Sequence, residues 1–269
     1  MLHLLLRHFT LLLGSTLLIG FIGVAWIGPT QMKYEPEKVS RNTYERPSKD
    51  YPFGTDKFGR DIQTRVVHAT QLDLRIAFTV ALISFAVGSV IGAIVGYYGD
   101  WLDAIVMRGV DVLFAFPSFL LAMVITGVLG DSERNVITAV TIAYIPYFVR
   151  LTRGQMLTVR TLPYADAAIS IGNPSWRVAL IHLLPNTLAP SLVQMSMVAG
   201  WAILDTAGLA FLGLGITSPT AEWGVMISEG AQRITTGEWW MWLYPGAALV
   251  LAAFAFNLIG DGLRNLLQQ

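Results

Sequence analysis

The chain has 269 residues, of which 54% are hydrophobic and 13% charged, and its mean hydropathy is +0.56. Soluble domains carry about 25% charged residues, so this composition indicates a membrane protein. The formal net charge of zero argues against a nucleic-acid partner, and the absence of cysteine excludes disulfides, zinc-thiolate sites, iron–sulfur clusters and cysteine nucleophiles.

Apolar runs of membrane-spanning length recur along the chain. A spanning helix needs about 20 apolar residues, and six segments approach this length: residues 9–27, 76–97, 104–128, 136–151, 188–212 and 244–260. No small-residue cleavage site follows the first run, so a retained helix is a better interpretation than a signal peptide. We therefore predict an all-α membrane protein with about six transmembrane helices and both termini on one side.

Residues 28–74 interrupt the apolar pattern with many charged residues and four prolines, and are predicted to lie outside the membrane. Within them, a turn-rich stretch precedes a possible interfacial helix over residues 61–72. On residue chemistry alone this stretch is a capped surface turn. Its motif residues are Gly54, Thr55, Asp56, Gly59, Arg60 and Asp61.

In the second span, Gly88, Gly92 and Gly96 lie four residues apart. Small residues at this spacing share one helix face and let a neighbouring helix approach closely. We predict a packing seam here.

Besides Arg150 at the exit of the fourth span, three charged residues fall inside predicted spans. Arg108 and Asp111 are three apart on one helical face, so we predict that they pair with each other rather than conduct ions. Pro117 should kink the same span. Asp205 is a candidate functional residue because intramembrane acids are costly, but without a visible relay partner we expect it to bond to a neighbouring helix.

Residues 160–190 are too polar to cross a membrane and predict a helix, a sharp turn and a second helix. Thr161 is suited to cap the first helix, and Gly172 to end it in the left-handed conformation. Asn173 is expected to cap the second helix, with a proline in the first turn of each helix. Pro185 is expected to stop the second helix or bend it into the next span.

The stretch between the fifth and sixth spans is rich in glycine and tryptophan. Gly213 and Gly215 could suggest a phosphate-binding loop, but no lysine or helix start follows them, so that interpretation is rejected. Trp239, Trp240 and Trp242 fit an aromatic belt at the membrane interface.

Motifs for catalysis are absent from the sequence. There is no Gly-x-x-x-x-Gly-Lys-Ser/Thr nucleotide loop and no His-Glu-x-x-His metal motif, and the four histidines, at positions 3, 8, 68 and 182, are scattered. We therefore expect no catalytic residue, no metal site and no cofactor bound by this chain.

The polar loop carries a recognisable spacing. Acid-Ala-Ala, three residues, Gly, then Leu-Pro resembles the EAA loop of bacterial ABC importer permeases, with an aspartate where glutamate is usual. The matching residues are Asp166, Ala167, Ala168, Gly172, His182, Leu184 and Pro185. The motif over 54–61, the run 113–118, the turn 211–215 and the segment 260–264 look like those of the dipeptide, oligopeptide and nickel branch of that family.

This resemblance implies a type I ABC importer permease fold with a cytoplasmic coupling helix in residues 161–185. It implies an N-terminal helix and extracytoplasmic segment in residues 1–69, a permease core in 70–262 and a cytoplasmic tail in 263–269. The implied partners are a second, homologous permease, two cytosolic ATPases that bind ATP and Mg²⁺, and an extracytoplasmic solute-binding protein. The implied substrates are di- or oligopeptides, with nickel or a metal chelate as the alternative.

Charge distribution predicts the orientation. Cytoplasmic loops of membrane proteins carry an excess of Lys and Arg, and several arginines fall on the side of the termini: Arg7, Arg150, Arg153, Arg160, Arg177 and Arg264. The protein is therefore expected in a bacterial inner membrane with both termini cytoplasmic. The alternative classes are an ion-coupled secondary transporter, for which Asp205 with Arg108 and Asp111 are the candidate residues, and a scaffold without transport.

Overall fold

The computed structural model describes the backbone of residues 2–267 and the side chains of residues 9–267. The described part of the chain is helical, with only an isolated β-bridge between Thr55 and Asp61. Its elements are α1 Leu2–Gln31, α2 Ile62–Tyr98, α3 Asp100–Phe114, α4 Ser118–Leu129, α5 Glu133–Val159, α6 Pro163–Ser170, α7 Ser175–Arg177, the π-helix η1 Val178–Leu183, α8 Leu184–Phe211, α9 Trp223–Ala231 and α10 Trp240–Leu267.

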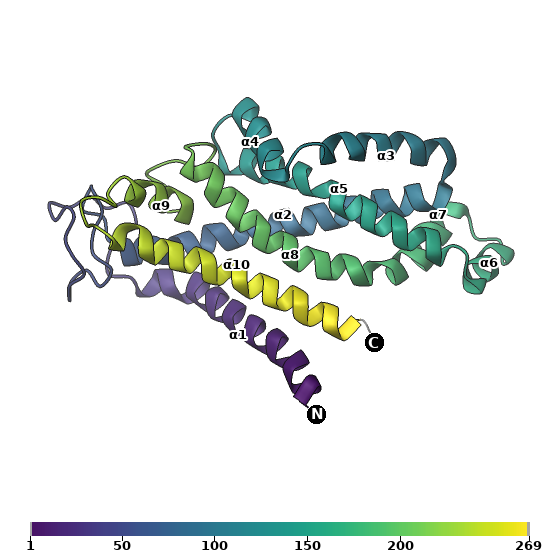
Figure 1. Cartoon of the computed structure of the whole chain (residues 1–269), viewed down its shortest axis with the longest axis horizontal. Helices are drawn as coiled ribbons and strands as arrows, with labels where there is room; N and C mark the ends of the chain where they lie inside the picture. The colour runs from purple at the N-terminus through teal and green to yellow at the C-terminus, as the bar shows by residue number, and fades with distance from the viewer. Residues whose placement is uncertain (1, 268–269) are drawn as a thin grey trace.

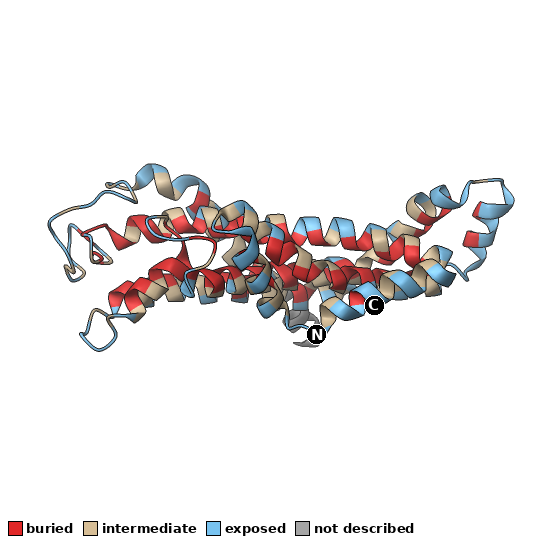
Figure 2. Cartoon of the chain, turned by 90° about the horizontal axis from the view of Figure 1, so that it is seen from above, coloured by how far each residue is buried: buried red, intermediate tan, exposed pale blue. Residues whose placement is uncertain are grey.

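The helices form an elongated bundle (Figure 1). Helices α6 and α7 lie at one end, which we call the hairpin end. Residues 32–61, residues 212–222 and α9 lie at the opposite end, which we call the loop end. Figure 2 shows the buried residues concentrated along the bundle interior, with exposed residues at both ends.

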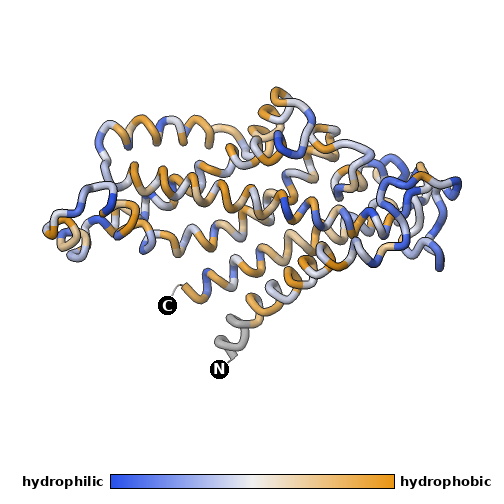
Figure 3. The backbone as a smooth tube through the Cα atoms, turned by 180° about the vertical axis from the view of Figure 1, so that it is seen from behind, coloured by the Kyte–Doolittle hydropathy of each residue, from blue (hydrophilic) through white to orange (hydrophobic). Residues whose placement is uncertain are grey.

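The predicted number of spans is confirmed. Among the described residues, five helices are long and apolar enough to cross a membrane, and there are six spans when the bent pair α3 and α4 counts as one broken span. Figure 3 shows apolar residues along the helices and a hydrophilic concentration at the loop end. Apolar side chains that point away from the bundle, such as Trp26 and Val128, suit contact with lipid.

Helices α2 and α5 meet at the predicted glycine seam. A Cβ atom added to Gly92 would lie 2.5 Å from the Val149 carbonyl oxygen, and one added to Gly88 would lie 2.5 Å from the Phe148 Cβ. At Gly96 the same atom would be 2.8 Å from the Met156 Cβ. The prediction of a seam is confirmed, because any side chain would force the two backbones apart.

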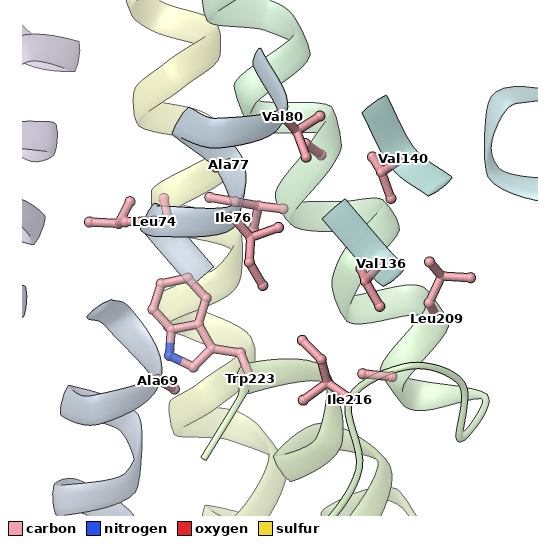
Figure 4. Packing of buried hydrophobic residues seen from close by; sticks show 14 of the residues in the cluster. Ala69, Leu74, Ile76, Ala77, Val80, Val136, Val140, Leu209, Ile216 and Trp223 are labelled. Carbon is pink, nitrogen blue, oxygen red and sulfur yellow. The ribbon is translucent and has the colours of Figure 1, made fainter. Parts of the chain in front are cut away.

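Near the loop end the core closes around Trp223. Its ring is fully buried beside α2 residues, and Val136, Leu209 and Ile216 belong to the same buried cluster, contributed by α5, α8 and the 212–222 segment (Figure 4). The indole Nε1 donates a hydrogen bond to the Val66 carbonyl at 3.3 Å. This polar handle is satisfied although the ring is out of solvent.

Several predicted boundaries move. The helix expected over 61–72 is the first part of α2, because Asp61 caps that helix by accepting a hydrogen bond from the Thr64 backbone N–H at 2.8 Å. The kink at Pro117 is a full break, with α3 and α4 bent by 90°. The predicted tail 263–269 is helical through Leu267, and Gln268 and Gln269 lie outside the described residues.

The predicted pair of Arg108 with Asp111 is wrong. Asp111 instead accepts a hydrogen bond from Arg150 Nη2 of α5 at 2.7 Å. The Arg150 guanidinium stacks over the Phe114 ring at 4.2 Å, one turn beyond Asp111, and this contact brings it to the carboxylate. Arg108 is exposed and makes no ion pair with any described residue.

Candidate functional site

The hairpin forms as predicted at Gly172 and differently at its caps. Gly172 has φ +86°, a left-handed conformation that turns the chain after α6. Thr161 does not cap α6: its hydroxyl donates to the Thr158 carbonyl at 2.8 Å, and Leu162 holds the cap position. Asn173 does not cap α7, because its amide donates to the Ala168 carbonyl at 2.9 Å and satisfies the open end of α6.

Pro185 does not stop the second helix. The preceding residues form the π-helix η1, and the Leu184 backbone N–H bonds to the Ala179 carbonyl, five residues back. This wider turn accommodates a proline, which has no N–H to donate. The chain is consequently helical without interruption from Ser175 to Phe211, through α7, η1 and α8.

The inner face of the hairpin is fixed to the bundle. Ala165 and Ala168, three residues apart in α6, are buried in a small apolar cluster with Met156 and Val159 of α5 and with η1. Leu184 packs against the same cluster. The small side chains let α6 lie close to the bundle, so the hairpin is attached to it by packing as well as by covalent connection.

The outer face of the hairpin is exposed and partly apolar. Asp166 and Ala167 point away from the bundle, and Asp166 has no ion-pair partner among the described residues. Around them lie large exposed apolar side chains, which we call the hairpin surface: Leu162, Tyr164, Ile169, Ile171, Trp176 and Ile181. Apolar residues gathered at the polar end of a membrane bundle are typical of a protein interface.

The remaining residues of the predicted coupling set divide between the two faces. Pro185 is exposed, whereas His182 is half-buried and its Nε2 is buried without a hydrogen-bond partner in the described part of the chain. Asn186 donates to the His182 carbonyl at 3.0 Å and to the Tyr164 hydroxyl at 3.3 Å, which ties α8 to α6.

At the loop end, the motif over residues 54–61 is buried rather than a surface turn. Arg60, 2% exposed, donates through Nε to Asp56 at 2.5 Å and through Nη2 to Glu229 of α9 at 2.9 Å. Asp56 also accepts from the Phe58 and Arg60 backbone N–H groups at 2.8 and 3.0 Å. The ion pairs therefore clamp the 32–61 segment onto α9.

Two other motif residues complete this clamp. Gly54 has φ +76°, and an added Cβ there would lie 2.6 Å from the Glu45 carbonyl oxygen. Trp240 donates through Nε1 to the Thr55 carbonyl at 3.2 Å and is only 2% exposed. The aromatic-belt prediction is therefore wrong for Trp240, because the extramembrane segment covers it.

The glycine turn after α8 has a structural geometry. Gly213 and Gly215 have φ near +80°, and the Gly215 N–H donates to Asp131 Oδ1 at 2.8 Å, which joins this turn to the α4–α5 connection. Beyond it, Glu222 caps α9 by accepting from the Val225 N–H at 2.7 Å. Burial raises the pKa of Glu222 to about 7, although hydrogen bonds with the Val225 N–H and with the Asp73 carboxyl oppose this rise.

Asp205 bonds to a neighbouring helix, as predicted: Tyr144 of α5 donates its hydroxyl to Asp205 Oδ2 at 2.7 Å. Sequence reasoning missed Tyr144, and it also missed Glu229 as the partner of Arg60. Both partners are distant in the chain, and neither lies in a motif.

No cluster of three or more metal-ligating residues occurs among the residues described here. The side chains of His3 and His8, and that of Arg7, lie outside them.

Comparisons with known proteins agree on one family. The family described as binding-protein-dependent transport system inner membrane component matches residues 88–269. A dipeptide transport system permease protein DppC of Alkalihalophilus pseudofirmus is 40% identical over 258 residues, covering 95% of this chain and 84% of that protein. A probable D,D-dipeptide transport system permease protein DdpC of Escherichia coli is 42% identical over 221 residues, 82% of this chain and 74% of that protein. A glutathione transport system permease protein GsiD of Pectobacterium atrosepticum is 36% identical over 265 residues, 97% of this chain and 87% of that protein.

Proposed function

The chain belongs to the family of binding-protein-dependent transport system inner membrane components, and we propose that it forms half of the pathway of an ATP-driven importer of di- and oligopeptides. It is a multi-pass permease subunit of an ABC importer in the inner membrane. The peptide substrate is inferred from relatives that are named as dipeptide and peptide permeases. A second permease subunit would complete the pathway.

The hairpin surface supports the proposed route of energy input. Asp166, a carboxylate without an ion-pair partner among the described residues, lies among these exposed apolar residues, and the inner face of the hairpin is fixed by buried Ala165 and Ala168. A cytosolic ATPase, two copies of which bind ATP and Mg²⁺, would dock here, and this chain would bind no nucleotide itself. Both termini and the hairpin end would then be cytoplasmic, and a solute-binding protein would meet the loop end.

The continuous helix from Ser175 to Phe211 supports a mechanical role for this contact. It begins in the hairpin and ends beside the Gly213–Gly215 turn at the loop end. A helix rises about 1.5 Å per residue, and the 37-residue helix from Ser175 to Phe211 is long enough to cross a membrane. Movement of an ATPase at the hairpin would therefore be carried across the membrane by one rigid element. Alternating access would follow from rocking of α8 and its packed neighbours.

Purification of the chain from its native membrane in mild detergent tests the proposal. We expect a cytosolic ATPase and a second permease to co-purify and the complex to hydrolyse ATP. The neighbouring binding protein is then tested for peptides against nickel; binding of nickel alone would move the substrate to a metal. Recovery of the chain alone, without ATP hydrolysis, would contradict the proposal and favour ion-coupled transport.

A further inference from the structure

A cavity of about 300 Å³ lies between the start of α4 and the helices α5 and α8. Ser118, the first residue of α4 after the break at Pro117, lines this cavity. Ligand pockets have volumes of about 300–1,000 Å³, and this cavity therefore suits one end of a small molecule. Its lining is Ser118, Tyr144, Tyr147, Trp201, Leu204 and Asp205.

Three aromatic rings surround the cavity. The centroids of Tyr144 and Tyr147 are 5.7 Å apart, those of Tyr144 and Trp201 are 6.1 Å apart, and those of Tyr147 and Trp201 are 6.0 Å apart. Phe114 packs edge-on behind Tyr147 at 4.8 Å and supports it. Tyr144 is buried and forms the back wall, whereas Tyr147 and Trp201 are partly exposed. Aromatic faces in this arrangement attract cations.

The carboxylate in this cavity has no cationic partner in the described part of the chain. Asp205 lies within ion-pair distance of no described Lys, Arg or His, whereas the α3 acids Asp111 and Asp103 pair with Arg150 and Arg153. The Tyr144 hydroxyl bonds to Oδ2, and no described residue donates a hydrogen bond to Oδ1. A charged group in a membrane span is costly and ordinarily has a partner. Asp205 thus has one free oxygen beside aromatic faces.

We propose that this cavity binds the α-ammonium group of the transported peptide during its passage. Asp205 Oδ1 accepts a charge-assisted hydrogen bond from the ammonium group, and the Tyr147 and Trp201 rings contact it by cation–π interactions. Tyr144 is a positioning residue that holds the carboxylate through Oδ2. This inference rests on the proposed peptide importer and deepens it, because it assigns the recognised substrate group to named residues.

Two other roles for Asp205 make different predictions. If it served only as the acceptor for Tyr144, Asp205→Asn, whose amide oxygen can still accept that hydrogen bond, would lower uptake no more than Tyr144→Phe does. If it carried protons, uptake would depend on the proton gradient. Binding of an ammonium group requires the negative charge and is independent of the gradient, so variants and conditions separate the three roles.

The test uses the complete importer, with both permeases, the ATPases and the binding protein, reconstituted in proteoliposomes. Uptake of labelled dialanine and ATP hydrolysis are measured together. Asp205→Asn should lower uptake at least tenfold and lower ATP hydrolysis much less, whereas Tyr144→Phe, which keeps the ring and removes the hydroxyl, should lower uptake less. Trp201→Leu should lower uptake several-fold, and Trp201→Phe should restore most of it.

Matched controls decide the outcome. Asp111→Asn removes a carboxylate outside the cavity and should retain at least half of the uptake. Three results would overturn this inference without affecting the proposed function. They are undiminished uptake by Asp205→Asn, equal losses of uptake in Asp205→Asn and Tyr144→Phe, and loss of uptake by the unmodified importer when a protonophore is added at constant ATP. If the wild-type importer takes up neither dialanine nor any other peptide with a free amino group, the proposed function itself fails.

Discussion

Replacing Arg60 with methionine should destabilise the loop end strongly. The substitution keeps much of the side-chain volume and removes the guanidinium, which leaves Asp56 and Glu229 buried with side-chain exposures of 4% and 9%. Breaking a buried ion pair in this way costs about 3–5 kcal/mol. Lys57, 3.5 Å from Glu229, and Arg65, 3.8 Å from Asp56, offset part of that cost, so we expect about 3 kcal/mol.

Thermal unfolding of the purified protein in detergent measures this effect. For a chain of this size, 1 kcal/mol corresponds to about 2–4 °C, so Arg60→Met should lower Tm by about 6–12 °C. Arg75→Met is the matched control, because Arg75 pairs with Glu133 on the surface with side-chain exposures of 59% and 36%. Such pairs contribute about 0–1 kcal/mol. Equal Tm values for the two variants would refute the idea that the Arg60 cluster is a buried clamp.

Four further outcomes are expected. Gly92→Ala should lower Tm by several degrees because the added methyl group pushes α2 away from α5. Gly127→Ala should not lower Tm, because there is open space around Gly127. Equal Tm shifts in the two variants would contradict close packing at the glycine seam. Since burial raises the pKa of Glu222 to about 7, the contribution of this residue to stability is fully present below the ordinary glutamate pKa of about 4.3 and is lost as pH rises through about 7. Glu222→Gln should flatten that fall in pH-dependent melting, and an unchanged slope would assign it to other groups. Gly172→Val should abolish transport while the protein remains in the membrane, because φ +86° strains a β-branched residue; wild-type uptake would contradict this. Asp166→Lys should reduce co-purification of the ATPase, and unchanged recovery would show that this acid does not contribute to docking.

Local signals in the sequence were sufficient for most of the fold. Apolar runs of bilayer length predict six spans because lipid leaves few alternatives to a helix. The spacing of Gly88, Gly92 and Gly96 predicts a seam because small residues on one helix face allow close packing whichever helix is the partner. The turn at Gly172 follows equally from the freedom of glycine to adopt positive φ.

Pairings between distant segments could not be predicted in the same way. Arg108 and Asp111 have the local spacing of an ion pair. Asp111 nevertheless pairs with Arg150, because the Arg150 guanidinium stacks on Phe114 beside this carboxylate. Asn173 fits a cap, but the open carbonyls at the end of α6 compete for its amide. The clamp around Arg60 depends on a glutamate 169 residues away, which no short motif contains.

The aromatic residues of the candidate substrate site could not be predicted from the sequence either. Asp205 stands out in the sequence as an acid inside a span, but Tyr144, Tyr147 and Trp201 are ordinary residues of apolar helices there. Only the packing of α5 against α8 brings their rings around the carboxylate. A site of this kind depends on tertiary contacts between helices.

Site-directed cross-linking from the hairpin surface tests the central claim most directly. The chain has no cysteine, so Ala167→Cys introduces a single exposed thiol on α6, and Lys38→Cys introduces one at the loop end as the control. In native membranes treated with a thiol-to-amine cross-linker, Ala167→Cys should join the chain to the co-purifying ATPase, and Lys38→Cys should not. No ATPase adduct from Ala167→Cys, or an adduct only from Lys38→Cys, would contradict coupling through the hairpin.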